Sequence, residues 1–166
     1  MRAYARRLGG DEELWAVTGI VHDLDYERHP DLDTGHPRYA IRELERLGYP
    51  QEVIDAVAGH ADFMGVPRDA QMAKALYAVD ELSGFVAACA LVRPTGIEGL
   101  APKSVKKKLK QPSFAAAVDR EGIARGAEEL SVDFTEHVQV VIDAMAERAE
   151  QLGLSAGQVA GQGTEA

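Results

Sequence analysis

The sequence predicts an all-α protein, organised as a single-domain bundle of about eight helices. Apolar residues recur at the three- and four-residue spacing of helices through most of the chain. The sequence shows no convincing alternation of apolar and polar residues, which would mark half-buried strands, and no internal repeat. A length of 166 residues suits one domain and allows a sizeable core.

Capping and stop residues delimit the helices. Asp11, Asp69 and Asp119 are suitable N-caps in front of apolar stripes, while Gly48 and Pro94 stop the helices that precede them. In chain order we expect helices over residues 1–8, 11–23, 34–47 (capped by Thr34), 50–60, 69–93, 104–110 (capped by Ser104) and 119–130, and a last helix that starts at Asp133 or Thr135. We assign residues 1–152 to the helical domain and expect the Gly-, Ser-, Ala- and Gln-rich tail, residues 153–166, to be disordered.

The helix over residues 69–93 is apolar on most sides, so we expect it at the centre of the domain. It nevertheless carries Asp80 among Val79, Leu82 and Phe85. An ionised carboxylate is costly to bury there unless it is paired or bound to a cation. Asp80 is therefore a candidate metal ligand, although an ion pair with an arginine or lysine explains it about as well.

Composition excludes several classes of function. The net charge of −9 argues against a general DNA binder or a protein of anionic membrane surfaces. No apolar run approaches the roughly 20 residues of a membrane span, and no signal peptide is visible. The single cysteine, Cys89, lies in an apolar stretch and is expected in the core. We expect a cytoplasmic protein.

Histidine and aspartate residues recur at the ends of predicted helices. His22 and Asp23 are adjacent at the end of one helix, His36 begins the next, and His60 ends the one after it. Imidazole and carboxylate groups are ligands for cations such as Zn, Mn and Fe. Each of these residues alone is more often structural, but several such groups can converge in the core of a helical bundle.

The order of His22-Asp23, His60 and Asp80 on an all-helical chain resembles the HD superfamily of metal-dependent phosphohydrolases, and several stretches resemble a bacterial subgroup of HDIG-type proteins within it. These stretches are residues 22–26, 75–82, 91–94, 104–108 and 113–116. The resemblance covers most of residues 1–152. It implies His22, Asp23 and Asp80 as core ligands, with His36 and His60 as ligands of a second metal or contacts to phosphate.

The resemblance also indicates a difference at the N-terminus. The first histidine of the family pattern lies on the helix before the His-Asp helix, which corresponds here to residues 1–8, and these hold no histidine. We expect that helix to be truncated, with the family histidine falling before Met1. The alternative is a protein that lacks this ligand.

The implied function is hydrolysis of a phosphate ester or nucleotide by water activated on one or two divalent cations, with Mn, Fe, Zn, Ni, Co and Mg all candidates. Asp23 would bridge two cations. Lys106 is a second catalytic candidate, although the basic run in which it lies is also explained as a solvated face of a helix. Arg38, Lys107 and Arg93 are candidate substrate contacts. Asp25 and Asp62 are suitable for orienting the neighbouring histidine ligands, although they are also explained as polar residues solvated at the ends of helices.

The expected partner is a small phosphorylated substrate, with nucleotides among the candidates, and a homo-oligomer stays open. The alternative function is an HD-like module that binds a metal or nucleotide with weak turnover or none.

Overall fold

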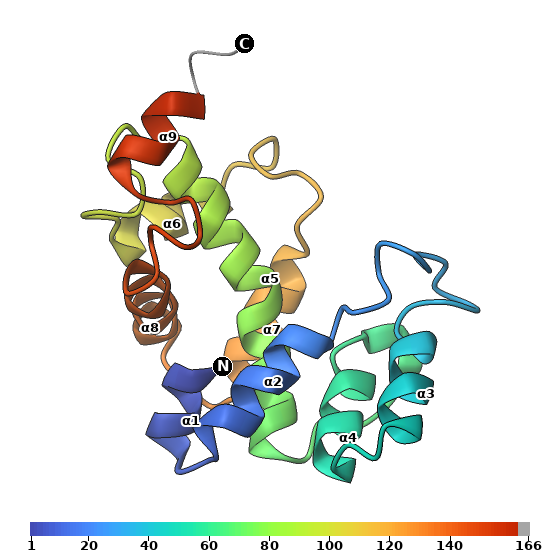
Figure 1. Ribbon diagram of the computed structural model, residues 1–166. Coiled ribbons are helices and arrows are strands. Elements are labelled where there is room, and N and C mark those ends of the chain that lie inside the picture. Colours follow the sequence, from blue (N-terminus) through green and yellow to red (C-terminus); the bar gives the residue numbers. More distant parts are fainter. Residues whose placement is uncertain (163–166) are drawn as a thin grey trace. The chain divides into compact units, whose positions relative to one another are not determined.

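The computed structural model describes residues 1–162 and is all-helical over that range, which confirms the predicted fold class (Figure 1). Residues 163–166, the end of the predicted tail, lie outside the described residues. The elements in chain order are α1 (Arg2–Leu8), α2 (Glu12–Val21), α3 (Arg38–Arg46), α4 (Gln51–Gly59), the 3-10 helix η1 (Asp62–Met64), α5 (Gln71–Leu91), α6 (Pro102–Leu109), α7 (Arg120–Glu129), α8 (Phe134–Ala146) and α9 (Ala156–Gln162).

Helix starts follow the predicted capping chemistry at three places. The side chains of Asp11, Asp119 and Asp133 each accept two backbone N–H groups from the first turn of the helix that follows. Two predicted starts are wrong. Helix α3 begins after Pro37, and Thr34 instead donates its hydroxyl to Asp31 at 2.7 Å. Helix α6 begins two residues before the expected Ser104, because its first residue is a proline that fits the first helical turn.

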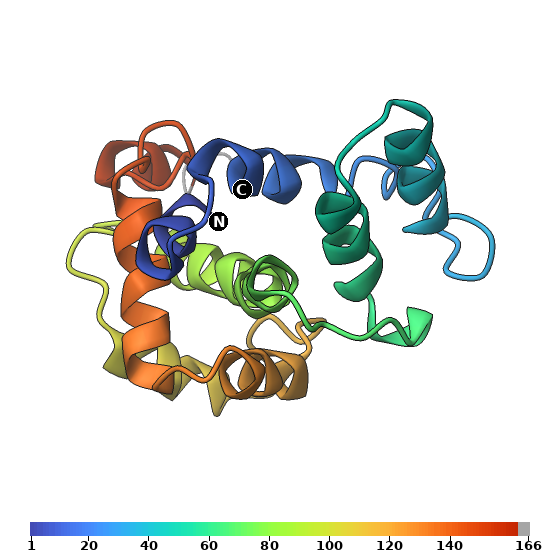
Figure 2. The ribbon, with the colours of Figure 1, turned by 90° about the horizontal axis from the view of Figure 1, so that it is seen from below.

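The chain divides into two compact units, Met1–Tyr77 and the residues from Ala78 on, with the boundary inside α5. In the first unit α2 packs against α1 and α4, and α3 packs against α4 (Figures 1 and 2). Its buried apolar side chains come from every one of these helices and from the start of α5. They include Tyr4, Trp15, Leu44, Val53, Val57 and Leu76.

The second unit has a core of its own, in which α8 packs against α6 and α7 (Figure 2). Side chains from α5 to α8 and from the following loops form this core, including Leu82, Phe85, Val86, Ile123, Val138, Ile142 and Leu154. Gly126 of α7 lies so close to Ala78 of α5 that a Cβ at residue 126 would be 2.7 Å from the Ala78 Cα. As predicted, α5 is long and contributes many of the buried side chains.

The beginning of the tail is folded, contrary to the expected disorder. Helix α9 occupies Ala156–Gln162, and Leu154 and Val159 are both buried. The backbone N–H of Ile97 donates to the carbonyl of Leu154 at 3.0 Å. Two buried apolar side chains and hydrogen bonds, including that of the Gln158 side chain to the Glu150 carbonyl at 2.9 Å, accompany the folding of this Gly- and Gln-rich segment. Over residues 1–162, none of the helices combines the length and the apolar character that crossing a bilayer requires.

Candidate metal centre

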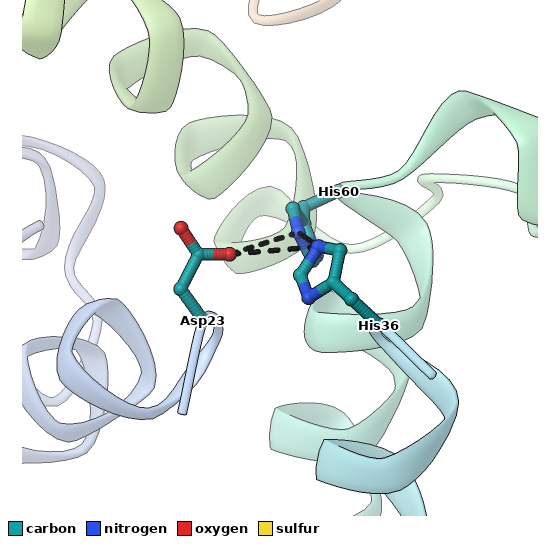
Figure 3. Close-up of side chains that lie close together, drawn as sticks. All are labelled: Asp23, His36 and His60. Carbon is teal, nitrogen blue, oxygen red and sulfur yellow. Dashed lines mark hydrogen bonds and ion pairs between the residues drawn. The ribbon is translucent and has the colours of Figure 1, made fainter. Parts of the chain in front are cut away.

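Asp23, His36 and His60 meet in the first unit, although they come from three separate segments (Figure 3). Asp23 follows the end of α2, His36 lies two residues before α3, and His60 is the C-cap of α4. Because α4 packs against both α2 and α3, the ends of the three helices bring these side chains together. Both histidines are buried, whereas the Asp23 side chain is 46% exposed and so leaves the cluster open to solvent.

The loop between α2 and α3 is folded back tightly to place His36. The backbone N–H of His36 donates to the carbonyl of His29 at 2.7 Å, and Gly35 N–H donates to the Asp31 carbonyl at 2.8 Å. A Cβ at residue 35 would overlap the His29 carbonyl oxygen. The close approach of the chain to itself therefore requires glycine at this position.

Three acceptor atoms face one another within the cluster. Asp23 Oδ1 lies 3.6 Å from His36 Nε2 and 3.5 Å from His60 Nε2, and the two Nε2 atoms are 3.2 Å apart. Ligands at about 2.1 Å from a tetrahedral cation are separated by about 3.4 Å. The three observed separations lie close to this value, so a single cation fits among the three atoms.

The opposite ring nitrogens fix which atoms of the histidines are available as ligands. Nδ1 of His36 lies 2.8 Å from Asp25 Oδ1, and Nδ1 of His60 lies 2.5 Å from the Val57 carbonyl oxygen. Nδ1 of His22 likewise lies 3.0 Å from the Gly19 carbonyl oxygen. Carboxylate and carbonyl oxygens only accept, so Nδ1 carries the proton in each ring. A neutral ring then presents an Nε2 lone pair, the form that binds a metal.

Asp23 is arranged to interact in two directions. While Oδ1 faces His36 and His60, Oδ2 lies 3.4 Å from Nε2 of His22. Its two oxygens thus face different imidazoles, and its role as a bridge between two cations stays a prediction. Burial raises the pKa of Asp23, but His60 and the other neighbouring histidines, in their protonated forms, more than offset this effect and lower the pKa below its usual value. Asp23 is therefore ionised and available as a ligand at neutral pH.

The predicted orienting residues have different partners. Asp25 is 1% exposed, and its second oxygen accepts the backbone N–H of Ala40 at 2.8 Å, so it joins His36 to the first turn of α3. Asp62 accepts hydrogen bonds from Arg68 at 2.8 Å and from the Tyr77 hydroxyl at 2.9 Å. Asp62 thus stabilises the segment that follows His60. Its predicted role in orienting His60 itself stays a prediction.

Other predicted site residues include Arg38, which makes another contact, and Asp80 and Lys106, which lie in the second unit. Arg38 donates to the Leu32 carbonyl and so holds the loop that carries His36. Asp80 lies on α5 beyond the unit boundary, and its role as a ligand stays a prediction. Lys106 donates to the Thr135 hydroxyl at 3.0 Å, within the second unit. Its catalytic role also stays a prediction.

Sequence reasoning missed Arg68 as a supporting residue. Its Nη1 donates to the Gly59 carbonyl at 2.7 Å as well as to Asp62, and its guanidinium stacks 3.6 Å from the centre of the Tyr77 ring. It therefore ties the end of α4, next to His60, to the start of α5. Tyr26 was also missed, and its ring meets that of His36 edge-on with 5.2 Å between the ring centres. Arg68 lies in a loop without a recognisable pattern, whereas Tyr26 belongs to the stretch 22–26 that resembles the family but was given no role of its own.

Comparison with known proteins gives a family match over the first half of the chain. Residues 1–84 match the model of the HD domain family, a stretch that contains every predicted metal ligand and excludes Arg93 and the lysines of α6. Proteins named ribonuclease Y from two strains of Thermus thermophilus are 33% identical to the chain over 75 residues, which is 45% of this chain and 12% of theirs. Ribonuclease Y of Oleidesulfovibrio alaskensis is 28% identical over 127 residues, 76% of this chain and 21% of that protein.

The chain thus spans only a small part of the length of these relatives. No solved structure is significantly similar to it. The family match covers half of the chain and includes the histidines and the aspartate that meet in the first unit. The protein belongs to the HD domain family.

Proposed function

We propose that the protein is a metal-dependent hydrolase of a small phosphate ester, with Asp23, His36 and His60 as the central ligands. The observation that carries this proposal is the convergence of three lone-pair atoms at 3.2 to 3.6 Å. Without a cation or an extra proton between them, the two Nε2 atoms and the Asp23 oxygen would repel one another. The set has the chemistry of a site for a first-row divalent ion.

A divalent cation at this site would lower the pKa of a coordinated water and polarise a phosphoryl oxygen. The chain's own residues supply the positioning. Asp25 holds His36 in the ligand tautomer, while the Val57 carbonyl does the same for His60. Asp23 contributes negative charge and keeps its second oxygen next to His22, which we propose as a ligand of a second cation. Asp80 is the further ligand that the sequence predicts.

The relatives support a phosphate ester as the class of substrate. They carry the name ribonuclease Y, and RNA is joined by phosphodiester bonds. The chain covers no more than 21% of those proteins, so we carry over only the type of bond and not the polymer. Phosphate monoesters, nucleotides and short phosphodiesters are therefore all suitable first substrates.

The test combines metal analysis with a substrate panel. Protein purified without chelators is assayed for bound metal, and hydrolysis is measured with phosphate mono- and diesters after addition of Mn, Co, Ni, Zn or Mg. We expect Asp23→Asn and His60→Gln to lose the bound metal and to lower hydrolysis by more than about a hundredfold. His29→Gln is the matched control, since His29 lies in the same loop but stacks on Tyr39 with 4.2 Å between the ring centres. Asp80→Asn tests the ligand predicted from the sequence.

A second candidate function, a binding module without turnover, has its own motivation. Helix α1 contains no histidine, whereas the family pattern begins with one on this helix. This function predicts metal retention that depends on Asp23 and His60, but no hydrolysis with any metal or substrate. Wild-type protein that holds no metal and hydrolyses no substrate would refute both candidates. Equal metal content in wild-type, Asp23→Asn and His60→Gln proteins would show that the metal lies elsewhere.

A further inference from the structure

A basic pocket of about 360 Å³ lies in the second unit, between the end of α5 and helix α6. Its cationic lining residues are Arg93, Lys107 and Lys108, and no carboxylate of the described part of the chain lines it. Its volume falls in the range of small-molecule sites, roughly 300 to 1,000 Å³. None of its lining residues belongs to the first unit, so the pocket shares no residue with the Asp23 cluster.

No carboxylate within residues 1–162 neutralises the three cations. In the part of the chain that the structure describes, no carboxylate lies within ion-pair distance of any of them. Burial raises the pKa of the Cys89 thiol in the pocket wall to about 11, so this group adds no negative charge either. A local charge of +3 in a protein of net charge −9 marks a place where an anion is attracted.

Two of the cations are held in place before any ligand binds. Arg93 donates through Nε to the Gly96 carbonyl at 3.0 Å, and through Nη2 to Thr95 and to the Glu98 carbonyl. Its Nη1 makes no hydrogen bond within residues 1–162 and is available to a ligand. The Lys108 ammonium lies 4.2 Å from the centre of the Phe114 ring. A preorganised site loses less conformational entropy when it binds.

We propose that this pocket binds the phosphate groups of a small polyphosphate ester. One phosphate monoester carries about −1.5 to −2 near neutral pH, so three cations exceed the charge of one group and suit two. Ser104 and Gln111 add a hydroxyl and an amide to the lining, and both can donate to phosphate oxygens. Cys89 and Leu100 form an apolar part of the wall, which suits the organic portion of an ester. The inference does not depend on hydrolysis at the Asp23 cluster.

Some lysines of α6 line the pocket and others do not, so a lysine outside the pocket serves as a control for the loss of charge. Lys107 and Lys108 line the pocket, whereas Lys106 is bonded to Thr135 and Lys103 does not line it. Lys103 is exposed on the same helix, so Lys103→Gln removes the same charge without touching the pocket. The double variant Lys107→Gln/Lys108→Gln removes two of the three cations.

The experiment is calorimetric titration of the full chain with pyrophosphate and with ADP, in buffer depleted of divalent metal. We expect saturable one-to-one binding of both probes, at least about tenfold weaker in the double variant and within about twofold of wild type for Lys103→Gln. Adenosine, which lacks phosphate, should not bind. Thermal unfolding of each variant shows whether the fold is retained.

The Asp23→Asn variant separates this proposal from the proposed hydrolase function. It should bind pyrophosphate as wild type does, because the pocket contains no residue of the cluster. Absence of saturable binding to wild-type protein would overturn the proposal, even if hydrolysis is found. So would wild-type affinity in the folded double variant, an equal loss in Lys103→Gln, or adenosine binding as tightly as ADP.

Discussion

Replacing Asp25 by asparagine should remove His36 from the ligand set while leaving the fold almost unchanged. The buried Asp25 carboxylate accepts one hydrogen bond from His36 Nδ1 and one from the Ala40 N–H, both at 2.8 Å. Asparagine has nearly the same shape but only one acceptor oxygen. The backbone N–H of Ala40 cannot change, so it keeps that oxygen, and the new NH₂ group faces His36.

The histidine can adapt by moving its proton. If Nδ1 accepts from the asparagine NH₂, the proton sits on Nε2, which lies 3.2 Å from His60 Nε2 and can donate to it. The metal-free protein then has no unsatisfied group, so its stability should change by less than about 1 kcal/mol. To bind a metal through Nε2, His36 must return its proton to Nδ1. The Nδ1–H group and the NH₂ group of the new asparagine are then two donors that face each other. That costs about 1 to 3 kcal/mol, or roughly tenfold to a hundredfold in affinity.

Titration calorimetry with Mn²⁺ measures the affinity, and denaturant unfolding in metal-depleted buffer measures the stability. Asp31→Asn is the matched control, because Asp31 lies in the same loop but accepts its hydrogen bonds from Asp33 and Thr34. Asp25→Asn protein that binds Mn²⁺ as tightly as wild type would refute the reasoning. A loss of affinity accompanied by an equal loss in Asp31→Asn would attribute the effect to the loop as a whole.

Three further changes test the supports of the site and of the second unit. Gly35→Ala should weaken Mn²⁺ binding by about tenfold or more, since a Cβ there would displace the His29 carbonyl and with it the loop; calorimetry measures this. Arg68→Ala should lower the free energy of unfolding by about 1 to 3 kcal/mol, because the Gly59 carbonyl and a carboxylate lose a charged donor; urea unfolding measures this. Burial lowers the pKa of His137 in the folded protein, so between the unfolded value of about 6.5 and the lower folded value the unfolded chain binds this proton more readily than the folded protein. The free energy of unfolding of wild type should therefore fall as pH drops through this range, by up to about 1.4 kcal/mol per pH unit. His137→Gln should remove this contribution to the pH dependence, which urea unfolding at a series of pH values measures.

The helices could be predicted because their signals are local. Asp11 caps α2 through atoms only two and three residues away, and such short-range chemistry is visible in the sequence. The start predicted for α3 is wrong for a reason that is also local in the sequence. Thr34 bonds to Asp31 behind it, and the loop then runs on until Pro37. The folded tail was missed because two apolar residues are too few to produce a periodic pattern.

The candidate site was predictable in residue type but not in geometry. The adjacency of His22 and Asp23 and the positions of His36 and His60 at helix ends indicated ligands. Which atoms meet depends on loop closure: Asp25 lies two residues from Asp23 in sequence, yet its partner is His36, eleven residues on. Likewise, the basic run of α6 could not be divided by sequence into residues that line the pocket and residues that do not, because helical rotation and packing decide this.

The distribution of charge favours a small phosphorylated ligand over a long nucleic acid for this chain. A protein that binds a nucleic-acid polymer neutralises many phosphates across a broad basic surface. Here the net charge is −9, and several arginines of the first unit are already paired with carboxylates. These pairs are Arg2–Glu13, Arg6–Glu12, Arg46–Glu43 and Arg68–Asp62. In the second unit, Arg93, Lys107 and Lys108 have no carboxylate partner among residues 1–162 and instead line one pocket of small-molecule size. A compact anion can be attracted to that pocket without meeting the rest of the acidic surface, whereas a polymer would extend over it and be repelled.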